Sequence, residues 1–357
     1  MKDTLLTLSI LALACACTGV PAPRPSAQDL ADGTVADGSL EVRRELETPA
    51  PAAPLILEKS AFEAAGEVSL PEVTPGEYEG LHNVFQLSET IISGGEPQGA
   101  AALEQLSAWG VRTILSVDGK APDAQTAASL GMRYVHVPIQ YSGINADEVA
   151  KLAKTFRELE APFYVHCFHG RHRGPAAAAL GRIVLDGVPR GQAIAEMRQW
   201  CATSSKYEGL YADVATAPVP SAAATERNPF AFDSEYRFEG LRAAMIPLPR
   251  HWDRVVDAAQ RDWALDPDHP DLVPAREAAE VLQILNACAE LPETETYADD
   301  FRVWLEQARE GAAQLVTALS AEVSAAADER DWRVEAAVAV EQVKQSCTAC
   351  HATYRNH

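Results

Sequence analysis

Two short motifs in this chain place cysteine at a fixed spacing from other reactive side chains. In the first, Cys167 is followed six residues later by Arg173, between an apolar run that ends at His166 and an alanine-rich segment that begins at Gly174-Pro175. When such a loop joins a strand to a helix, its backbone N–H groups and the helix N-terminus point at a bound anion. The same positive field favours the thiolate form of Cys167, and the planar guanidinium group of Arg173 can hold two phosphoryl oxygens. The predicted anion-binding residues are Phe168, His169, Gly170, Arg171, His172 and Arg173.

The second motif is Cys347-Thr348-Ala349-Cys350-His351. On a helix, residues at i, i+3 and i+4 share one face, so both thiols can form thioether bonds to one haem while His351 binds its iron. The alternatives are half of a zinc site and a redox-active Cys-x-x-Cys pair. A zinc site needs a second Cys or His pair at suitable spacing, which the sequence lacks, and a redox pair usually opens a helix after a strand. The motif therefore predicts one covalent haem c, attached at Cys347 and Cys350, with His351 as an axial iron ligand.

The first motif resembles the His-Cys-x5-Arg loop of the dual-specificity and protein-tyrosine phosphatase superfamily. The resemblance covers about residues 83–211 and includes the segment Ile92-Ser93-Gly94-Gly95-Glu96-Pro97, which is similar to one in small bacterial members. It implies hydrolysis of phosphate monoesters through a phosphocysteine intermediate, with Cys167 as the nucleophile and Arg173 as the group that holds the transition state. The substrate that it implies is a small anionic or phosphorylated molecule.

Two positions depart from the pattern of that superfamily. Gly174 stands where the family usually has Ser or Thr, which helps the thiolate leave. The family's general-acid Asp is also missing, because the segment 137–142 reads Val-Pro-Ile-Gln-Tyr-Ser. Asp147, the nearest downstream carboxylate, is either a replacement acid or the charge of a helix N-terminus. His169 and His172 are further candidate proton donors, or they only add positive potential. Without an acid, turnover of poor leaving groups would fall by about two to four orders of magnitude.

The sequence leaves three functions open for this loop. It is a catalytic phosphatase loop, an anion-binding loop without catalysis, or a loop that carries a persulfide on Cys167. The third function arises because some bacterial relatives that lack the upstream Asp accompany sulfur-handling enzymes. Nothing in the sequence selects sulfur over phosphorus.

The second motif closes a helical region, and this placement resembles class II c-type cytochromes, the cytochrome c′ family. The resemblance covers about residues 235–357, and Tyr354-Arg355 match the aromatic and basic pair that usually follows the histidine. It implies a haem in the core of a four-helix bundle, which transfers electrons or binds a small gas. It also makes Met245 the candidate sixth iron ligand, although two prolines follow it closely and can break its helix. His251 is a second candidate for that role.

The order of predicted elements divides the chain into two structured regions. Residues 81–212 alternate strand and helix patterns, which predicts an α/β domain with a mostly parallel sheet and helices on both faces. Residues 235–357 hold only helical patterns and predict an all-α four-helix bundle. A flexible acidic and Pro-rich tether over 18–80 and a linker over 213–234 flank the first domain. The predicted strands lie at 83–87, 111–117, 134–139 and 162–166, and the predicted helices at 99–109, 123–130, 146–159, 175–185, 191–200, 235–262, 275–289, 297–326 and 331–354.

Residues 1–17 have the features of an export signal. Lys2 precedes a short apolar run over 5–14, and small residues with Cys15 and Cys17 follow it. Ala-Leu-Ala before Cys15 resembles a bacterial lipoprotein cleavage box, so a lipid anchor on Cys15 is one alternative and ordinary signal cleavage is the other. Both predict a periplasmic or outer-surface protein, where haem attachment takes place, and a periplasmic redox partner.

The net charge limits the possible partners of the chain, and two further cysteines remain to be assigned. The formal net charge of -21 excludes nucleic acid and anionic membrane surfaces as partners, because both would repel the chain. Cys201 and Cys288 stand alone on predicted helices. We expect them to be small buried apolar side chains rather than a disulfide.

Overall fold

The computed structural model describes residues 51–266, 272–321 and 332–355. The predicted export signal with Cys15 and Cys17, and the predicted tether up to residue 50, lie outside the described residues. The strands are β1 (Gly76–Tyr78), β2 (Leu81–Gln86), β3 (Ile91–Gly94), β4 (Thr113–Ser116), β5 (Arg133–His136) and β6 (Phe163–His166).

The six strands form one mixed sheet in the order β1-β2-β3-β6-β4-β5. Strands β3, β6, β4 and β5 run parallel, with Tyr164 of β6 opposite both Ile92 of β3 and Ile114 of β4. Strands β1 and β2 add antiparallel pairs at one edge. The four-stranded part agrees with the predicted parallel sheet. It also makes the carboxyl ends of β4 and β6 neighbours, so the segments that follow these two strands begin side by side.

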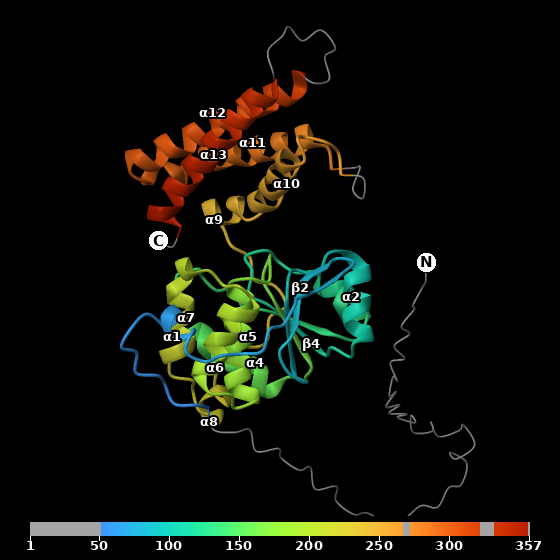
Figure 1. The fold of residues 1–357 in the computed structure, drawn as a ribbon, viewed down its shortest axis with the longest axis vertical. Helices are drawn as coiled ribbons and strands as arrows, with labels where there is room; N and C mark the ends of the chain where they lie inside the picture. Colours follow the sequence, from blue (N-terminus) through green and yellow to red (C-terminus); the bar gives the residue numbers. More distant parts are fainter. Residues whose placement is uncertain (1–50, 267–271, 322–331, 356–357) are drawn as a thin grey trace, which may run out of the picture. The chain divides into compact units, whose positions relative to one another are not determined.

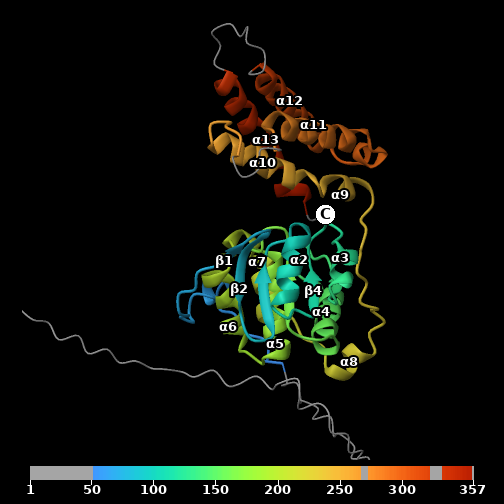
Figure 2. The ribbon, with the colours of Figure 1, turned by 90° about the vertical axis from the view of Figure 1, so that its right-hand side faces the viewer.

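Helices cover both faces of this sheet (Figures 1 and 2). Along β6, Tyr164 belongs to the apolar core beneath α2 (Gly99–Ala108) and α3 (Ala124–Ser129). Phe163 and Val165 belong to the core on the other face, with α4 (Ala146–Glu158) and α5 (Arg173–Leu185). This alternation follows from the two-residue period of a strand. The helices of this region are α1 (Ala61–Ala64), α2 (Gly99–Ala108), α3 (Ala124–Ser129), α4 (Ala146–Glu158), α5 (Arg173–Leu185), α6 (Arg190–Ala195), α7 (Glu208–Thr216) and α8 (Ala222–Glu226), and a π-turn over Glu196–Trp200 extends α6.

Residues 51–80 pack against the α/β region, although the sequence assigned them to the tether. Ala61 is fully buried, and its N–H group donates to Glu208 Oε1 at 2.5 Å. The Leu55 N–H group donates to the Ala215 carbonyl oxygen at 2.9 Å. The segment contains only short elements, so hydrophobic periodicity does not reveal it. The same reason explains why the sequence missed β1, β3, α7 and α8.

The rest of the described chain is helical. Helix α10 (Leu248–Gln260) packs against α11 (Pro274–Glu290), α11 against α12 (Asp299–Ala321), and α12 against α13 (Trp332–Tyr354). Their common apolar core contains Val255, Val281, Leu315 and Val343. The predicted all-α region is therefore confirmed, while a closed four-helix bundle stays a prediction. The helices are α9 (Gly240–Met245), α10 (Leu248–Gln260), α11 (Pro274–Glu290), α12 (Asp299–Ala321) and α13 (Trp332–Tyr354), and a 3-10 turn covers Pro292–Thr296.

The predicted single helix over 235–262 is wrong. The chain becomes helical only at Gly240, and it breaks between Met245 and Leu248. Pro247 cannot donate a backbone hydrogen bond, so it interrupts the first helix, and Pro249 fits the first turn of the second.

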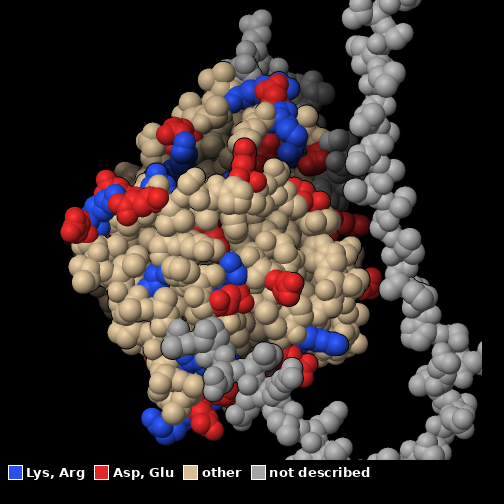
Figure 3. All heavy atoms as spheres, turned by 60° about the horizontal axis from the view of Figure 1, so that its bottom comes forward, with Lys and Arg blue, Asp and Glu red and all other residues tan. Residues whose placement is uncertain are grey.

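Two surface properties complete the description. No helix within the described ranges is both long and apolar enough to cross a membrane. Figure 3 shows one face of the molecule, on which acidic and basic side chains are scattered over a mostly uncharged surface. The net negative charge of the chain is therefore not gathered on that face.

Candidate functional site

The loop that contains Cys167 leaves β6 and enters α5, as the sequence predicted. Gly170 has a φ of +69°, and a Cβ atom there would lie only 2.4 Å from the Gly94 carbonyl carbon. Only glycine fits this conformation and this contact. A Cβ atom on Gly174 would lie 2.9 Å from the Cys167 nitrogen. A side chain at position 174 would therefore require the backbone near Cys167 to shift.

The loop is fastened to the protein by its carbonyl groups. The Phe168 carbonyl accepts from the Glu96 N–H group at 3.0 Å, and the His169 carbonyl accepts from Asn83 Nδ2 at 3.0 Å. The Arg171 carbonyl accepts from Thr203 Oγ1 at 2.7 Å. Within residues 51–266, 272–321 and 332–355, the backbone N–H groups of residues 168–173 have no protein acceptor. A loop whose carbonyl groups are used while its N–H groups remain free is an anion cradle.

Arg173 lies beside this cradle and is 7% exposed. Its Nη2 donates to Asp118 Oδ1 at 2.5 Å and to the Tyr141 hydroxyl oxygen at 3.1 Å, and its guanidinium carbon lies 4.2 Å from the centre of the Tyr141 ring. Its Nε is buried and has no hydrogen-bond partner among the residues that the structure describes. Burial lowers the pKa of Arg173, but Tyr141, Asp118 and Cys167 together raise it above its usual value. Arg173 is therefore a fixed cation with one buried N–H group available to an anion.

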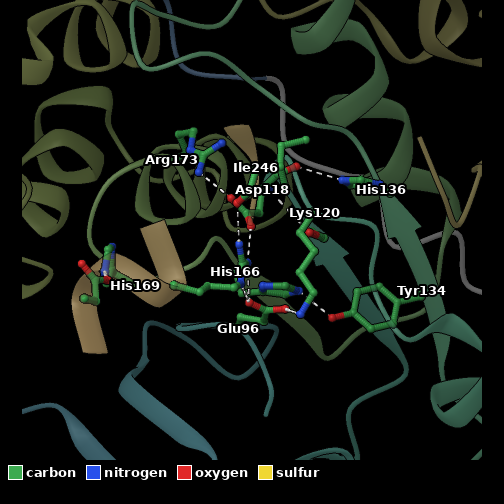
Figure 4. A network of polar contacts seen from close by, with 12 residues as sticks. Glu96, Asp118, Lys120, Tyr134, His136, His166, His169, Arg173 and Ile246 are labelled. Carbon is green, nitrogen blue, oxygen red and sulfur yellow. Dashed lines mark hydrogen bonds and ion pairs between the residues drawn. The ribbon is translucent and has the colours of Figure 1, made fainter. Parts of the chain in front are cut away.

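Asp118 connects this arginine to a larger ion-pair network (Figure 4). Its Oδ2 accepts from Arg250 Nη2 at 2.8 Å, and Arg250 Nη2 also donates to Glu96 Oε2 at 2.5 Å. Lys120 Nζ donates to Glu96 Oε1 at 2.7 Å. Burial would raise the pKa of Asp118, but Arg173 and Arg250 hold it well below its usual range. The Asp118 carboxylate is therefore ionised and shared between two guanidinium groups.

The sequence analysis missed Asp118, Glu96 and Arg250. One signal could have found Asp118, because it follows the predicted strand over 111–117 at the carboxyl edge of a parallel sheet, where ligands usually bind. No sequence signal pairs Arg250 with it, because the two residues are 132 positions apart.

Two buried histidines stand behind the site, and both are neutral at pH 7. Burial lowers the pKa of His166 to about 4, and its Nε2 lies 2.6 Å from the Tyr134 hydroxyl group. Burial also lowers the pKa of His136. The His136 Nε2–H donates to the Asp118 carbonyl oxygen at 2.8 Å, while its Nδ1 accepts from the Tyr236 N–H group at 2.9 Å. His136 therefore fixes the backbone of Asp118.

The predicted proton donors lie in different surroundings. Asp147 is in the first turn of α4, where it is exposed and lies 2.6 Å from Lys151 Nζ. His169 Nε2 lies 2.7 Å from Asp253 Oδ2 on the surface. Burial, His169 and Arg173 lower the pKa of His172 to about 4. Asp147 thus lies where a carboxylate stabilises the N-terminus of a helix. The His172 ring is neutral at pH 7.

The second motif lies on α13. Cys347 and Cys350 are free, and both are half-buried against the helical core, whereas His351 is exposed. Burial raises the pKa of each thiol to about 11, which is opposite to the lowered pKa of a redox-active Cys-x-x-Cys pair. Within the described residues, no three His, Cys, Asp or Glu side chains converge as they would around one ion. Haem attachment needs no such convergence, because its two thioether carbons are separate from its iron.

The surroundings of this motif also fit haem. The Tyr354 ring, three residues after His351, packs against Phe301 at 5.3 Å and Trp304 at 6.2 Å between ring centres. Aromatic walls of this kind suit an apolar macrocycle. Met245 is the last residue of α9 and is half-buried against the same core. His251 Nδ1 lies 2.8 Å from Glu277 Oε2, so it already has a partner.

The other predicted cysteines agree with the sequence analysis. Cys201 and Cys288 are both free and buried, with 2% and 0% of their surface exposed. Within the described part of the chain, neither forms a disulfide.

Part of the chain resembles known phosphatases. It is 29% identical over 121 residues to the dual specificity protein phosphatase TpbA of Pseudomonas aeruginosa, which is 33% of this chain and 54% of that protein. The same protein from a second strain is 28% identical over 120 residues, 32% of this chain and 53% of its own length. The chain therefore spans about half the length of the curated relatives that it matches. No protein-family model matches the chain.

Similar solved structures include two of TpbA and one of a putative phosphatase. The crystal structure of P. aeruginosa TpbA has a TM-score of 0.34 and 24% identity, covering 41% of this chain and 90% of that chain. A putative phosphatase (DUF442) from Shewanella putrefaciens has a TM-score of 0.31 and 19% identity, covering 38% and 93%. A TpbA variant in complex with pTyr has a TM-score of 0.32 and 21% identity, covering 40% and 88%. The predicted resemblance of the helical region to cytochrome c′ stays a prediction.

Proposed function

We propose that the Cys167 loop binds phosphate monoesters and hydrolyses them through a phosphocysteine intermediate. One observation carries this proposal. Among the described residues, the N–H groups of residues 168–173 and the Nε–H group of Arg173 have no acceptor, and all of them belong to the loop and helix start that follow Cys167 at the end of β6. The sequence similarity to proteins named dual specificity protein phosphatase supports a phosphorylated substrate.

The reaction would use these groups in order. The amides of the loop and Arg173 hold the three non-bridging phosphoryl oxygens, and the Cys167 thiolate attacks phosphorus. Arg173 reaches the phosphoryl group through its free Nε, because Asp118 and Tyr141 hold its Nη2. The ester oxygen leaves with a proton, and water then cleaves the S–P bond to release inorganic phosphate.

Hydrolysis of para-nitrophenyl phosphate by the purified chain tests this proposal. We expect turnover in the wild type and its loss in Cys167→Ser, while Cys201→Ala, which removes a second buried free thiol, keeps turnover. If the wild type binds vanadate without turnover, the loop is an anion-binding module. If the wild type neither binds vanadate nor turns over the ester, the cradle is not formed and the proposal fails.

We also propose that α13 carries one haem c on Cys347 and Cys350, with His351 as the proximal iron ligand. The free thiols, their position on one helix face with the histidine and the aromatic wall around Tyr354 support this proposal. The haem would supply electron transfer or binding of a small gas. In this proposal Met245 is the candidate sixth ligand, and the chain is exported to the periplasm or outer surface, where its redox partner would be found.

Covalent attachment is tested by acid–organic extraction of protein produced with a periplasmic haem-attachment system. Wild-type protein should keep its haem, and the double variant Cys347→Ala, Cys350→Ala should contain none, while Cys288→Ala should keep it. Haem that is extracted intact from the wild type contradicts the proposal. The spin state of the reduced iron then tests Met245, because Met245→Ala should convert a low-spin spectrum to a high-spin one.

A further inference from the structure

We propose that Tyr141 donates the proton to the leaving group of the phosphatase reaction, in place of the carboxylic acid that the segment 137–142 lacks. This inference rests on the proposed function of Cys167. It concerns one hydroxyl group and its position beside the catalytic arginine.

The geometry places the Tyr141 hydroxyl at the site with its hydrogen available. Arg173 Nη2 donates to the Tyr141 oxygen at 3.1 Å. The oxygen is therefore an acceptor in that bond, and the hydroxyl hydrogen points elsewhere. Within the part of the chain that the structure describes, no acceptor takes this hydrogen. An ester oxygen of a substrate held by Arg173 would meet a free O–H donor.

The other titratable groups near Cys167 are poorly suited to this step. Both oxygens of Asp118 form ion pairs, and Arg173 and Arg250 keep its pKa so low that it has no proton to give. His172 has a pKa of about 4 and is a neutral ring at pH 7. Asp147 is paired with Lys151 on an exposed helix turn. A phenol, by contrast, keeps its proton at neutral pH.

The charges around the Tyr141 ring change when Cys167 attacks phosphorus. Burial raises the pKa of Tyr141, and a negative Cys167 and Asp118 raise it further, while Arg173 and Arg355 lower it. When Cys167 attacks phosphorus, its negative charge leaves the sulfur, so one of the groups that hold the proton on Tyr141 disappears. The two guanidinium groups then stabilise the phenolate, since their carbons lie 4.2 and 3.9 Å from its ring centre. The Arg173 and Arg355 guanidinium groups lie over this ring, and the His172 and Tyr207 rings pack against it. The Cys167 and Asp118 charges also act on its hydroxyl group.

In this reaction Tyr141 gives up one proton and later regains one. In the first half, an S–P bond forms, the P–O bond to the alcohol breaks, and the Tyr141 hydrogen moves to the alcohol oxygen. In the second half, water attacks phosphorus and gives a hydrogen to the Tyr141 phenolate. The S–P bond then breaks, and inorganic phosphate and the Cys167 thiolate are released. No oxidant or other reactant is required.

Leaving-group dependence tests the proposal in the full-length chain. We expect Tyr141→Phe to lower kcat on phenyl phosphate by about two to four orders of magnitude, the range of general-acid catalysis. On para-nitrophenyl phosphate, whose phenolate leaves without help, the loss should be only a few-fold. Tyr207→Phe is the matched control, because its ring lies 5.1 Å from Tyr141, and it should change neither rate. Vanadate binding should be the same in all three proteins, since binding needs no proton donor.

The pH profile is the second measurement. The pKa of Tyr141 is raised, so its proton is lost only as the pH rises above the usual range of a phenol. Wild-type kcat on phenyl phosphate should therefore stay level from neutral pH to pH of about 9, whereas a carboxylic acid donor would make it fall above a pH of about 6. An equal loss on both esters, or no loss, in Tyr141→Phe overturns this inference and leaves the phosphatase function intact. A wild type that hydrolyses neither ester overturns the phosphatase function itself.

Discussion

The Cys167 loop and the Cys347–His351 segment both combine cysteine with cationic or metal-binding side chains. They differ in how deeply the cysteines are buried and in which groups surround them. Cys167 is 1% exposed, and the loop around it is held by carbonyl contacts that leave its N–H groups free. Cys347 and Cys350 are half-buried on one side of a helix, next to aromatic rings. The groups of the first site all come from the polypeptide, whereas the proposed haem site would need a group that the polypeptide does not supply.

The two sites also differ in the charge of their side chains. Around Cys167, the buried Asp118 carboxylate holds the Arg173 guanidinium group in place, and the Arg173 Nε–H group stays available to an anion within the described residues. Around the second motif, burial raises the pKa of both thiols to about 11, so they are neutral. A charged pocket that is already formed can be recognised by its unsatisfied donors. An apolar attachment site shows only free thiols and ring surfaces, which is why its assignment depends more strongly on the sequence motif.

The largest expected effect tests the claim that the first site is prepared for an anion. Arg173→Ala removes the guanidinium group that donates to both Asp118 and Tyr141. We expect kcat/KM on para-nitrophenyl phosphate to fall by about 10²–10³-fold, the scale of losing one transition-state donor. The control is Arg171→Ala, whose guanidinium contacts the amide oxygen of Asn83, and it should have a much smaller effect. Equal losses would show that the cradle responds to general positive charge.

The sequence predicted this site well where its residues are adjacent in the chain. Cys167 and Arg173 belong to one strand–loop–helix segment, and local chemistry identifies such a segment. Asp118 and Glu96 come from segments that follow β4 and β3, so they join the site only through the strand order of the sheet. The short buried strand β3 was missed because four apolar and small residues show no useful period. The break in the first helix of the helical region, by contrast, was readable from Pro247 and Pro249.

Arg250 tests whether the two sites are independent. It belongs to α10 of the helical region, but its guanidinium group binds Asp118 and Glu96 of the Cys167 site. In Arg250→Met, the Asp118 carboxylate would keep Arg173 as its guanidinium partner. It would then neutralise more of the positive charge of Arg173. We expect phosphate and vanadate to bind about tenfold more weakly, a loss of about 1.4 kcal/mol. Haem content should not change. Vanadate titration of both proteins measures this, and unchanged affinity would mean that Asp118 does not transmit the loss of Arg250.

The same network predicts how stability responds to acid. The pKa of Asp118 is lowered in the folded protein, so the stability that its ion pairs provide is present above its unfolded pKa of about 3.9 and is lost as the pH falls below that. Denaturation midpoints of wild type and Asp118→Asn should therefore differ most at neutral pH and converge in stronger acid. A difference that is constant with pH would assign the role of Asp118 to packing.

The smallest expected effect concerns Asp147, the carboxylate that competes with Tyr141 for the role of proton donor. Asp147 lies in the first turn of α4, where Asn145 already caps the helix through the Asp147 and Glu148 N–H groups. Its side chain is 66% exposed and pairs with Lys151 at 2.6 Å. Such a charge stabilises a helix by about 0.3–1 kcal/mol and has no contact with the cradle.

Asp147→Asn should therefore lower the denaturation midpoint slightly and leave kcat on phenyl phosphate within about twofold of wild type, far from the hundredfold or greater loss of general-acid catalysis. Measured beside Tyr141→Phe on the same ester, it separates the two donors directly. A loss of a hundredfold in Asp147→Asn, with full activity in Tyr141→Phe, would mean that the N-terminal turn of α4 reaches the cradle during turnover. The Cys167 site would then also be incomplete until its substrate binds, and its contrast with the second motif would no longer hold.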